Sequence, residues 1–157
     1  MNTIKDFYSR QRQKFFSYLV RRSGNCDQAC DILQESFTRL IEKYPPEHFT
    51  PQLLFTIGRN LMRDALRRNR GSAPLSIEKE HATGDPNHEL LVREEYRRVL
   101  AAMKHLEEDE RDLISLVVSS DMSYREVADV TGISEANVKV KIHRARKKLR
   151  NLMGTER

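Results

Sequence analysis

Hydrophobic residues recur every three or four positions along most of the chain, which is the period of an amphipathic helix. In the first half this period marks three segments: residues 4–22, 27–44 and 50–70. Gly24 separates the first two segments, and Pro45 and Pro46 end the second. Thr50 is a favourable N-cap for the third, because proline follows it at the first helical position. We therefore predict three helices in this half, the last of them closed by Gly71.

The second half shows the same period in shorter segments. Hydrophobic positions mark a fourth helix over 92–106 and a fifth around 113–117, which starts among acidic residues as the helix dipole favours. Between the halves, residues 71–89 mix Gly, Pro, Ser and charge without a period, which is typical of a linker. No segment convincingly alternates with the period of a strand. The sequence predicts an all-α fold with two small helical domains, 1–70 and 90–157, joined by this linker.

Residues 122–149 have the pattern of a helix-turn-helix. Ser123 and Glu126 form a capping box that opens a short helix. Gly132 suits the turn, and Ser134 caps the helix that follows. On this second helix, apolar residues four, three and four positions apart form one stripe: Val138, Ile142, Ala145 and Leu149. We predict that this stripe is buried and anchors the helix.

The opposite face of the same helix is mostly cationic. A helix entering the major groove would reach base edges with Lys139, Val140, His143 and Arg144. A second set suits phosphate contacts by position and chemistry: Asn137, Lys141, Arg146, Lys147 and Lys148. The helix therefore predicts duplex DNA binding, although each of these residues taken singly also fits a solvated surface.

The charge distribution agrees with an anionic partner. The net charge is +5, but residues 1–70 carry 13 Lys and Arg against 7 Asp and Glu, residues 71–130 carry 7 against 14, and residues 131–157 carry 8 against 2. Two cationic ends separated by an acidic middle indicate two contacts with a polyanion such as the nucleic-acid backbone. Charge alone fits a solubilising surface equally well.

Other classes of site find little support in the sequence. Cys26 and Cys30 lie four positions apart in a predicted helix, which favours two ordinary thiols and leaves redox sensing as a minor alternative. The sequence lacks HExxH, a nucleophile elbow and a phosphate-binding glycine loop, so we expect no enzyme, metal site, cofactor or small-molecule substrate. Without an export signal or a membrane-length apolar run, a cytoplasmic location is expected.

Three blocks of the sequence resemble the extracytoplasmic-function (ECF, group 4) sigma factors of the sigma-70 family, which are bacterial transcription initiation factors. "DQACDILQESFTRLIEKY" resembles the region 2.1 to 2.2 helix, and "LLFTIGRNLMRDALRR" resembles regions 2.3 to 2.4. "ISEANVKVKIHRARKKLR" is similar to the region 4.2 helix. The resemblance implies that 1–70 is region 2, which binds core polymerase and the -10 element. It implies that 90–157 is region 4, which binds the -35 element.

The resemblance also implies site residues. The residues that would contact the β′ clamp helices of polymerase are Asp31, Leu33, Gln34, Glu35 and Phe37. A second set would bind the -10 element, where a base flips out of the stack: Arg59, Asn60, Arg63, Arg67 and Arg68. Leu33 and Phe37 also lie on an apolar stripe and fit the core. Members often carry tryptophan near the start of the third helix; this chain has none, so Phe49 and Phe55 are candidates for base stacking, or for the core.

The function implied is that of a sigma factor that binds core RNA polymerase, through its β′ clamp helices and β flap, and directs promoter recognition and opening. An anti-sigma factor is the expected inhibitor, and it would hold the chain in the cytoplasm or at the inner membrane face. The alternative is a stand-alone helix-turn-helix regulator, which would bind a palindromic duplex site tightly without polymerase. A polymerase-binding decoy without promoter activity is a further alternative.

Overall fold

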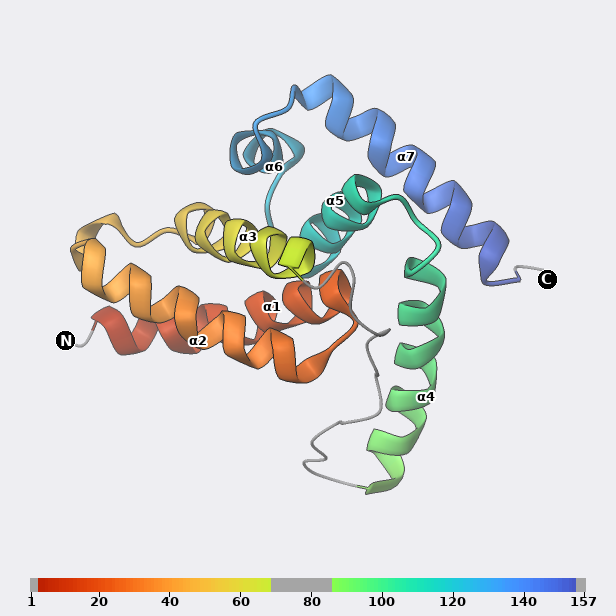
Figure 1. Cartoon of the computed structure of the whole chain (residues 1–157), viewed down its shortest axis with the longest axis horizontal. Coiled ribbons are helices and arrows are strands. Elements are labelled where there is room, and N and C mark those ends of the chain that lie inside the picture. Colours follow the sequence, from red (N-terminus) through yellow and green to blue (C-terminus); the bar gives the residue numbers. More distant parts are fainter. Residues whose placement is uncertain (1–2, 69–85, 155–157) are drawn as a thin grey trace.

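The structure is a computed structural model that describes residues 3–68 and 86–154, and all regular structure in these residues is helical (Figure 1). This confirms the predicted all-α class. The elements are α1 (Thr3–Ser23), α2 (Cys26–Lys43), the 3₁₀ turn η1 (Pro46–His48), α3 (Pro51–Arg68), α4 (Pro86–Met103), α5 (Glu108–Ser119), α6 (Tyr124–Thr131) and α7 (Glu135–Leu152). None of the helices described has the length and apolar content needed to cross a bilayer.

Local sequence signals set the ends of the first helices, and those predicted at Gly24 and Thr50 are among them. Gly24 follows α1 with a φ of +70°, a conformation that glycine adopts without strain. The side chain of Asn25 caps α2, because its Oδ1 accepts a hydrogen bond from the backbone N–H of Gln28 at 2.9 Å. Thr50 Oγ1 accepts in the same way from the backbone N–H of Leu53 at 3.1 Å, at the start of α3.

Helix α4 begins earlier than predicted. It starts at Pro86, so residues 86–89 are helical where the sequence predicted linker, and proline in the first turn costs no helical hydrogen bond. It also ends earlier, at Met103, and Leu106 is buried in the turn before α5. Three predictions fall outside the described residues: Arg70 as the end of the third helix, Gly71 as its stop, and residues 71–85 of the linker.

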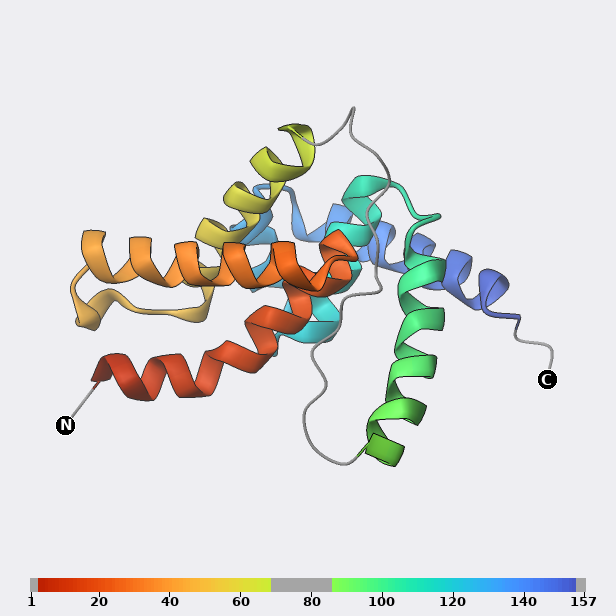
Figure 2. The ribbon, with the colours of Figure 1, turned by 60° about the horizontal axis from the view of Figure 1, so that its bottom comes forward.

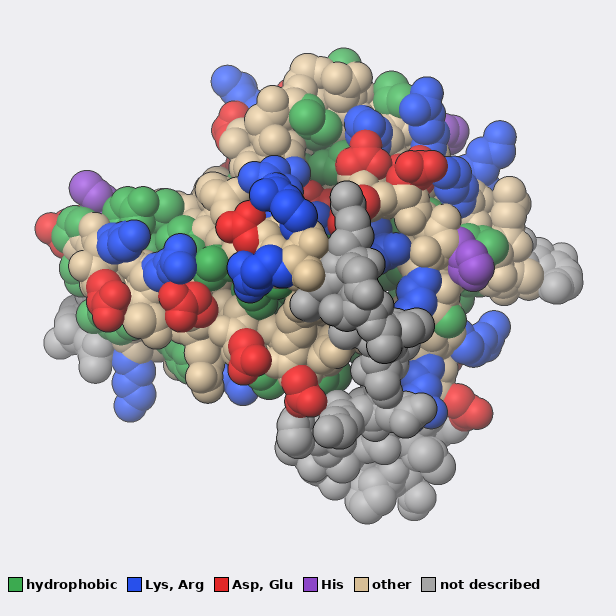
Figure 3. Space-filling view, in the orientation of Figure 1, with side chains coloured by type: hydrophobic (Ala, Val, Ile, Leu, Met, Phe, Trp, Pro, Cys, Tyr) green, Lys and Arg blue, Asp and Glu red, His purple; other side chains and the backbone are tan. Residues whose placement is uncertain are grey.

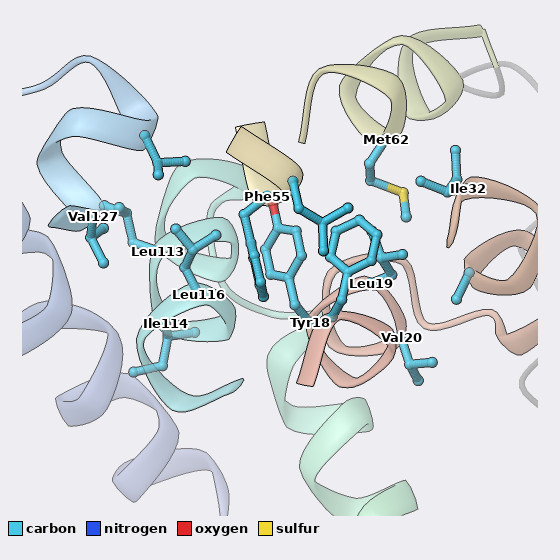
Figure 4. Close-up of a cluster of buried hydrophobic side chains, with 14 of the residues drawn as sticks. Tyr18, Leu19, Val20, Ile32, Phe55, Met62, Leu113, Ile114, Leu116 and Val127 are labelled. Atoms are coloured by element: carbon cyan, nitrogen blue, oxygen red, sulfur yellow. The ribbon is translucent and has the colours of Figure 1, made fainter. Parts of the chain in front are cut away.

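The two halves of the chain pack against each other around one continuous core. Helix α1 contacts α2 and α3 of its own half and α5 of the other, and α3 also contacts α6 (Figures 1 and 2). Tyr18, Leu19 and Phe55 of the first half belong to the same buried cluster as Leu113 and Leu116 of α5 (Figure 4). The halves that the sequence predicted as two domains are therefore closed on each other in this structure.

Helices α1 and α3 meet at Gly58. A Cβ atom at this position would lie 2.3 Å from the ring of Phe15, which is fully buried. The Phe15 ring packs edge-on against Phe37 and Phe55, with centroids 5.9 and 5.1 Å away. Glycine is required at Gly58 because the ring occupies the space that a side chain would need.

Helices α6 and α7 form the predicted helix-turn-helix. The backbone N–H of Glu126 donates to Ser123 Oγ at 3.1 Å, and the backbone N–H of Ser123 donates to Glu126 Oε1 at 2.9 Å, which completes the capping box. Gly132 lies in the turn with a φ of +81°. Ser134 Oγ then caps α7 by accepting from the backbone N–H of Asn137 at 3.1 Å.

The two cysteines lie on the first turns of α2. Neither Cys26 nor Cys30 forms a disulfide within the described residues, and both are partly buried. This agrees with the expectation of ordinary thiols one helical turn apart.

Candidate nucleic-acid interface

Helix α7 is anchored through the stripe that the sequence predicted. Val138, Ile142 and Ala145 are at most 1% exposed, and Leu149 is partly buried against the same core. These residues pack α7 against α5 and α6. The opposite face therefore points to solvent, where Lys and Arg side chains gather along the helix (Figure 3).

The four residues predicted to reach base edges lie together on this outward face. Lys139, Val140, His143 and Arg144 are all exposed. Val140 is 46% exposed and lies among these cations. Its chemistry suits contact with the methyl group of thymine, while Arg144 suits a guanine edge.

The residues predicted to hold phosphates fall into two groups. Asn137, Arg146 and Lys147 are exposed on α7. Lys141 instead pairs with Asp109, and Lys148 Nζ lies 2.9 Å from Glu110 Oε1, so two of the cations are partly neutralised by the acidic first turn of α5. The hydrogen bond from Lys141 lowers the pKa of Asp109, with its positive charge acting in the same direction.

The residues predicted for the -10 element lie on α3 in two different environments. Asn60, Arg63, Arg67 and Arg68 are exposed, and Arg63 Nη2 donates to Asn60 Oδ1 at 3.0 Å. Cationic side chains gather over the C-terminal half of α3 in the space-filling view (Figure 3). Arg59 is different, because its side chain is only 17% exposed and is directed at the second half.

Arg59 belongs to a buried polar cluster centred on Asp112 of α5. Asp112 Oδ2 accepts from Arg59 Nε at 2.6 Å, and Asp112 Oδ1 accepts from the hydroxyl of Tyr18 at 2.6 Å. Arg22 Nε lies 3.2 Å from Asp112 Oδ1, and the side chains of this pair are 4% and 2% exposed. Sequence reasoning missed this cluster, because its members lie in segments that have no periodic relation to each other.

We expect Tyr18 to titrate separately from the other tyrosines. Burial raises the pKa of Tyr18 well above its ordinary value of about 10, and the charge of Asp112 raises it further. Because the folded chain holds this proton more tightly than the unfolded chain, this contribution to stability is complete below about pH 10 and is lost as the pH rises above that value. An ultraviolet titration of the five tyrosines should show one phenol that ionises late.

A Tyr18→Phe variant checks this titration. It should remove the phenol that ionises late, because that phenol is the buried one that donates to Asp112. If Tyr18→Phe removed an ordinary phenol, the buried hydrogen bond to Asp112 would not describe the chain in solution.

Three candidate contact residues turn out to belong to the core. Phe55 is 0% exposed and its ring packs against Tyr18, with centroids 5.5 Å apart. The assignment of Phe55 to base stacking is therefore wrong for this structure, because neither face of the ring is open to a base. Leu33 and Phe37 are 5% and 6% exposed, so the core alternative replaces polymerase contact for both.

Phe49 keeps part of its surface open. It follows η1 and is partly buried, with its ring centroid 5.4 Å from that of Phe7. Phe49 also lines an apolar groove of about 280 Å³, and all of the lining comes from the first half: Ile4, Lys5, Phe7, Tyr8, Phe37, Ile41 and Phe49. The sequence signal for this groove was apolar residues at helix positions that the core does not use, such as Ile41, which is 46% exposed.

The polar residues predicted to contact polymerase lie on α2, N-terminal to Phe37 and Ile41, which line this groove. Asp31, Gln34 and Glu35 are all exposed on the outer face of α2. Glu35 Oε2 accepts a hydrogen bond from Arg39 Nε at 2.9 Å, one turn further along the helix. Helix α2 thus carries polar and charged groups on its outer face and also supplies Phe37 and Ile41 to the apolar groove.

Comparison with known proteins gives a consistent set of relatives. The sequence profile of sigma-70 region 4 matches residues 96–149. The chain is 33% identical over 147 residues to the ECF RNA polymerase sigma factor EcfG of Rhodopseudomonas palustris, covering 87% of this chain and 77% of that protein. It is 30% identical over 165 residues to the RNA polymerase sigma factor CarQ of Myxococcus xanthus, covering 98% and 90%.

Two solved structures share the fold. CnrH, in complex with the cytosolic domain of CnrY, has a TM-score of 0.72 and 24% identity, covering 98% of this chain and 89% of that chain. RpoE, in complex with the anti-sigma factor NepR from Bartonella quintana, has a TM-score of 0.71 and 24% identity, covering 98% and 99%. Both likenesses extend over the first and the second half.

Proposed function

The chain belongs to the ECF family of RNA polymerase sigma factors, and we propose that its two halves divide promoter recognition between them. As a sigma factor it directs transcription initiation by RNA polymerase. In our proposal residues 1–70 bind core polymerase and the -10 element, residues 90–157 bind the -35 element, and the intervening segment links them. A stand-alone regulator is not favoured, because the relatives that match along both halves are sigma factors.

The observation that carries the proposal is the two-sided character of α7. One side holds three residues that are at most 1% exposed, and the other presents Lys139, Val140, His143 and Arg144 to solvent. The helix also lies inside the stretch that matches sigma-70 region 4. We assign base contacts in the -35 element to these four residues. We assign phosphate contacts to Asn137, Arg146 and Lys147. Lys141 and Lys148 would also contact phosphates once their ion pairs with Asp109 and Glu110 are broken.

The first half contributes a surface for core polymerase and a surface for the -10 element. The exposed face of α2, with Asp31, Gln34 and Glu35, is our candidate for the β′ clamp helices, and the second half is our candidate for the β flap. On α3 the residues proposed for the -10 element are Asn60, Arg63, Arg67 and Arg68, and Phe49, which precedes the N-terminus of α3, is the stacking candidate. Arg59 joins them only if its contact with Asp112 is broken.

The work done is physical rather than covalent, so we propose no catalytic residue in this chain. Each DNA contact alone is weak, and core polymerase raises the effective concentration of the second contact once the first is made. Binding energy then offsets the cost of opening the duplex and flipping a base. The specificity of initiation follows from two separate contacts that must both fit.

An anti-sigma factor is the further partner that we propose. RpoE of Bartonella quintana has been solved with such an inhibitor, the anti-sigma factor NepR. In this chain the apolar groove beside α2 leaves Tyr8 and Ile41 exposed, and exposed apolar surface of this kind marks interaction sites. An inhibitor that covers the groove would also block the polymerase face, and would keep the chain in the cytoplasm or at the inner membrane face.

Reconstituted transcription tests the proposal. We expect purified chain with core polymerase to give promoter-dependent transcripts from a genomic DNA library, while core polymerase alone gives none and the chain alone binds duplex DNA weakly. Tight binding of the chain alone to a palindromic site, without transcripts, would instead support a helix-turn-helix regulator. Binding to core polymerase without transcripts would indicate a decoy.

A further inference from the structure

Polar contacts join the two halves at several points besides the apolar core. Each contact pairs a residue of the first half with one of α5, α6 or the loop between them. They are Lys14 with Asp121, Arg21 Nη1 with Ser119 Oγ at 2.7 Å, Gln52 Nε2 with Glu126 Oε2 at 3.0 Å, and the Asp112 cluster. The closed arrangement is thus specified by matched donors and acceptors as well as by apolar burial.

Asp112 has partners only in the opposite half, as far as the described residues go. Its carboxylate oxygens meet Tyr18, Arg22 and Arg59, and all three come from α1 or α3. The neighbouring acids on α5, Asp109 and Glu110, pair instead with cations of α7 in their own half. Asp112 therefore serves the contact between the halves, and the packing of the second half does not depend on its charge.

The same contact withdraws Arg59 from the surface. Its Nε donates to Asp112 Oδ2 at 2.6 Å, and its side chain is 17% exposed, whereas Arg63, one turn further along α3, is exposed. Polynucleotide phosphate and the Asp112 carboxylate compete for the same guanidinium group, because both are anionic acceptors. DNA that engages Arg59 must therefore displace α5.

We propose that the second half inhibits the first within one chain, with Asp112 as the intramolecular substitute for promoter DNA at Arg59. The inference rests on the proposed -10 role of Arg59. Only open molecules expose Arg59 to DNA. The apparent affinity of the free chain for -10 DNA is therefore the affinity of the open molecules multiplied by the fraction of molecules that are open. Core polymerase, by binding the two halves at separate places, would favour the open state.

The first test compares two Asp→Asn variants that remove the same charge. Asp112→Asn should increase the radius of gyration in small-angle X-ray scattering. It should also tighten binding of the free chain to a single-stranded oligonucleotide carrying a mapped -10 element by about tenfold or more. Asp129→Asn, at an exposed site on α6, should change the affinity less than twofold. Equal affinities for the two variants, with unchanged helical content, would overturn the proposal.

The second test locks the halves together. In a Cys26→Ser, Cys30→Ser chain, Lys14→Cys and Asp121→Cys would be joined by a reductant-cleavable bismaleimide before core polymerase is added. We expect run-off transcription to fall at least tenfold, and to return when the crosslinker is cleaved; chains with only one of these cysteines should be unaffected. Full activity of the locked chain would overturn the inhibition, whereas a cleaved chain without activity would contradict the proposed function itself.

Discussion

Truncating Phe15 to alanine is expected to lower the free energy of unfolding by about 3–5 kcal/mol, the usual cost of removing a buried aromatic ring. Phe15 is 0% exposed and its ring contacts the rings of Phe37 and Phe55. The ring also fills the space over Gly58, so its loss leaves a cavity between α1 and α3. Urea denaturation followed by circular dichroism measures the change.

The same variant should reverse the effect of Gly58→Ala. In the parent chain the added Cβ would lie 2.3 Å from the Phe15 ring, so we expect a loss of about 1–3 kcal/mol from overpacking. In the Phe15→Ala background the clash is gone, and alanine should gain up to about 1 kcal/mol from its helix propensity. Equal effects of Gly58→Ala in both backgrounds would show that the close approach of α1 and α3 is not the cause.

Reversing the charge of Arg144 is expected to remove promoter-dependent transcription while leaving polymerase binding intact. Arg144 is exposed on the outward face of α7, and Arg144→Glu replaces a potential guanine contact with a group that phosphate repels. The loss of one base contact is worth about 1–3 kcal/mol, which corresponds to roughly 5- to 150-fold less transcript at limiting sigma factor. Run-off transcription and a pull-down with core polymerase measure the two properties separately.

Lys104→Glu is the matched control for this variant. Lys104 is an exposed cation of the second half in the turn before α5, near Gly24 and not on the outward face of α7, so its reversal changes the net charge equally. We expect it to reduce transcription less than threefold, through general electrostatics alone. If both variants lost the same activity, the base-reading assignment on α7 would be wrong.

Most helices and their ends were predictable because their determinants are local. A capping side chain such as Asn25, Ser123 or Ser134 bonds to an N–H three residues away, and a glycine such as Gly132 acts on its own backbone. The buried and outward faces of α7 were predictable for a related reason, because the helical period fixes which residues share a face.

The role of an apolar residue within a face was not predictable in the same way. Phe49 and Phe55 looked equivalent as aromatic candidates, yet Phe55 is fully buried while Phe49 is partly open beside the groove. Leu33 and Phe37 likewise fitted both core and contact until the packing of α1 against α2 covered them. Burial at such positions depends on which helix lies opposite, and the period of one helix carries no such information.

The sequence by itself determined the all-helical class, the helix-turn-helix and the cationic face of α7, since hydrogen bonds and periodicity over a few residues are sufficient for each. Only the tertiary structure decided that Arg59 is held by α5 while Arg63 remains in solvent. The contacts that make this difference join Asp112 to Arg59, which is 53 positions away along the chain, and to Tyr18, which is 94 positions away. Separations of that length leave no trace in local pattern, because they arise when whole helices pack.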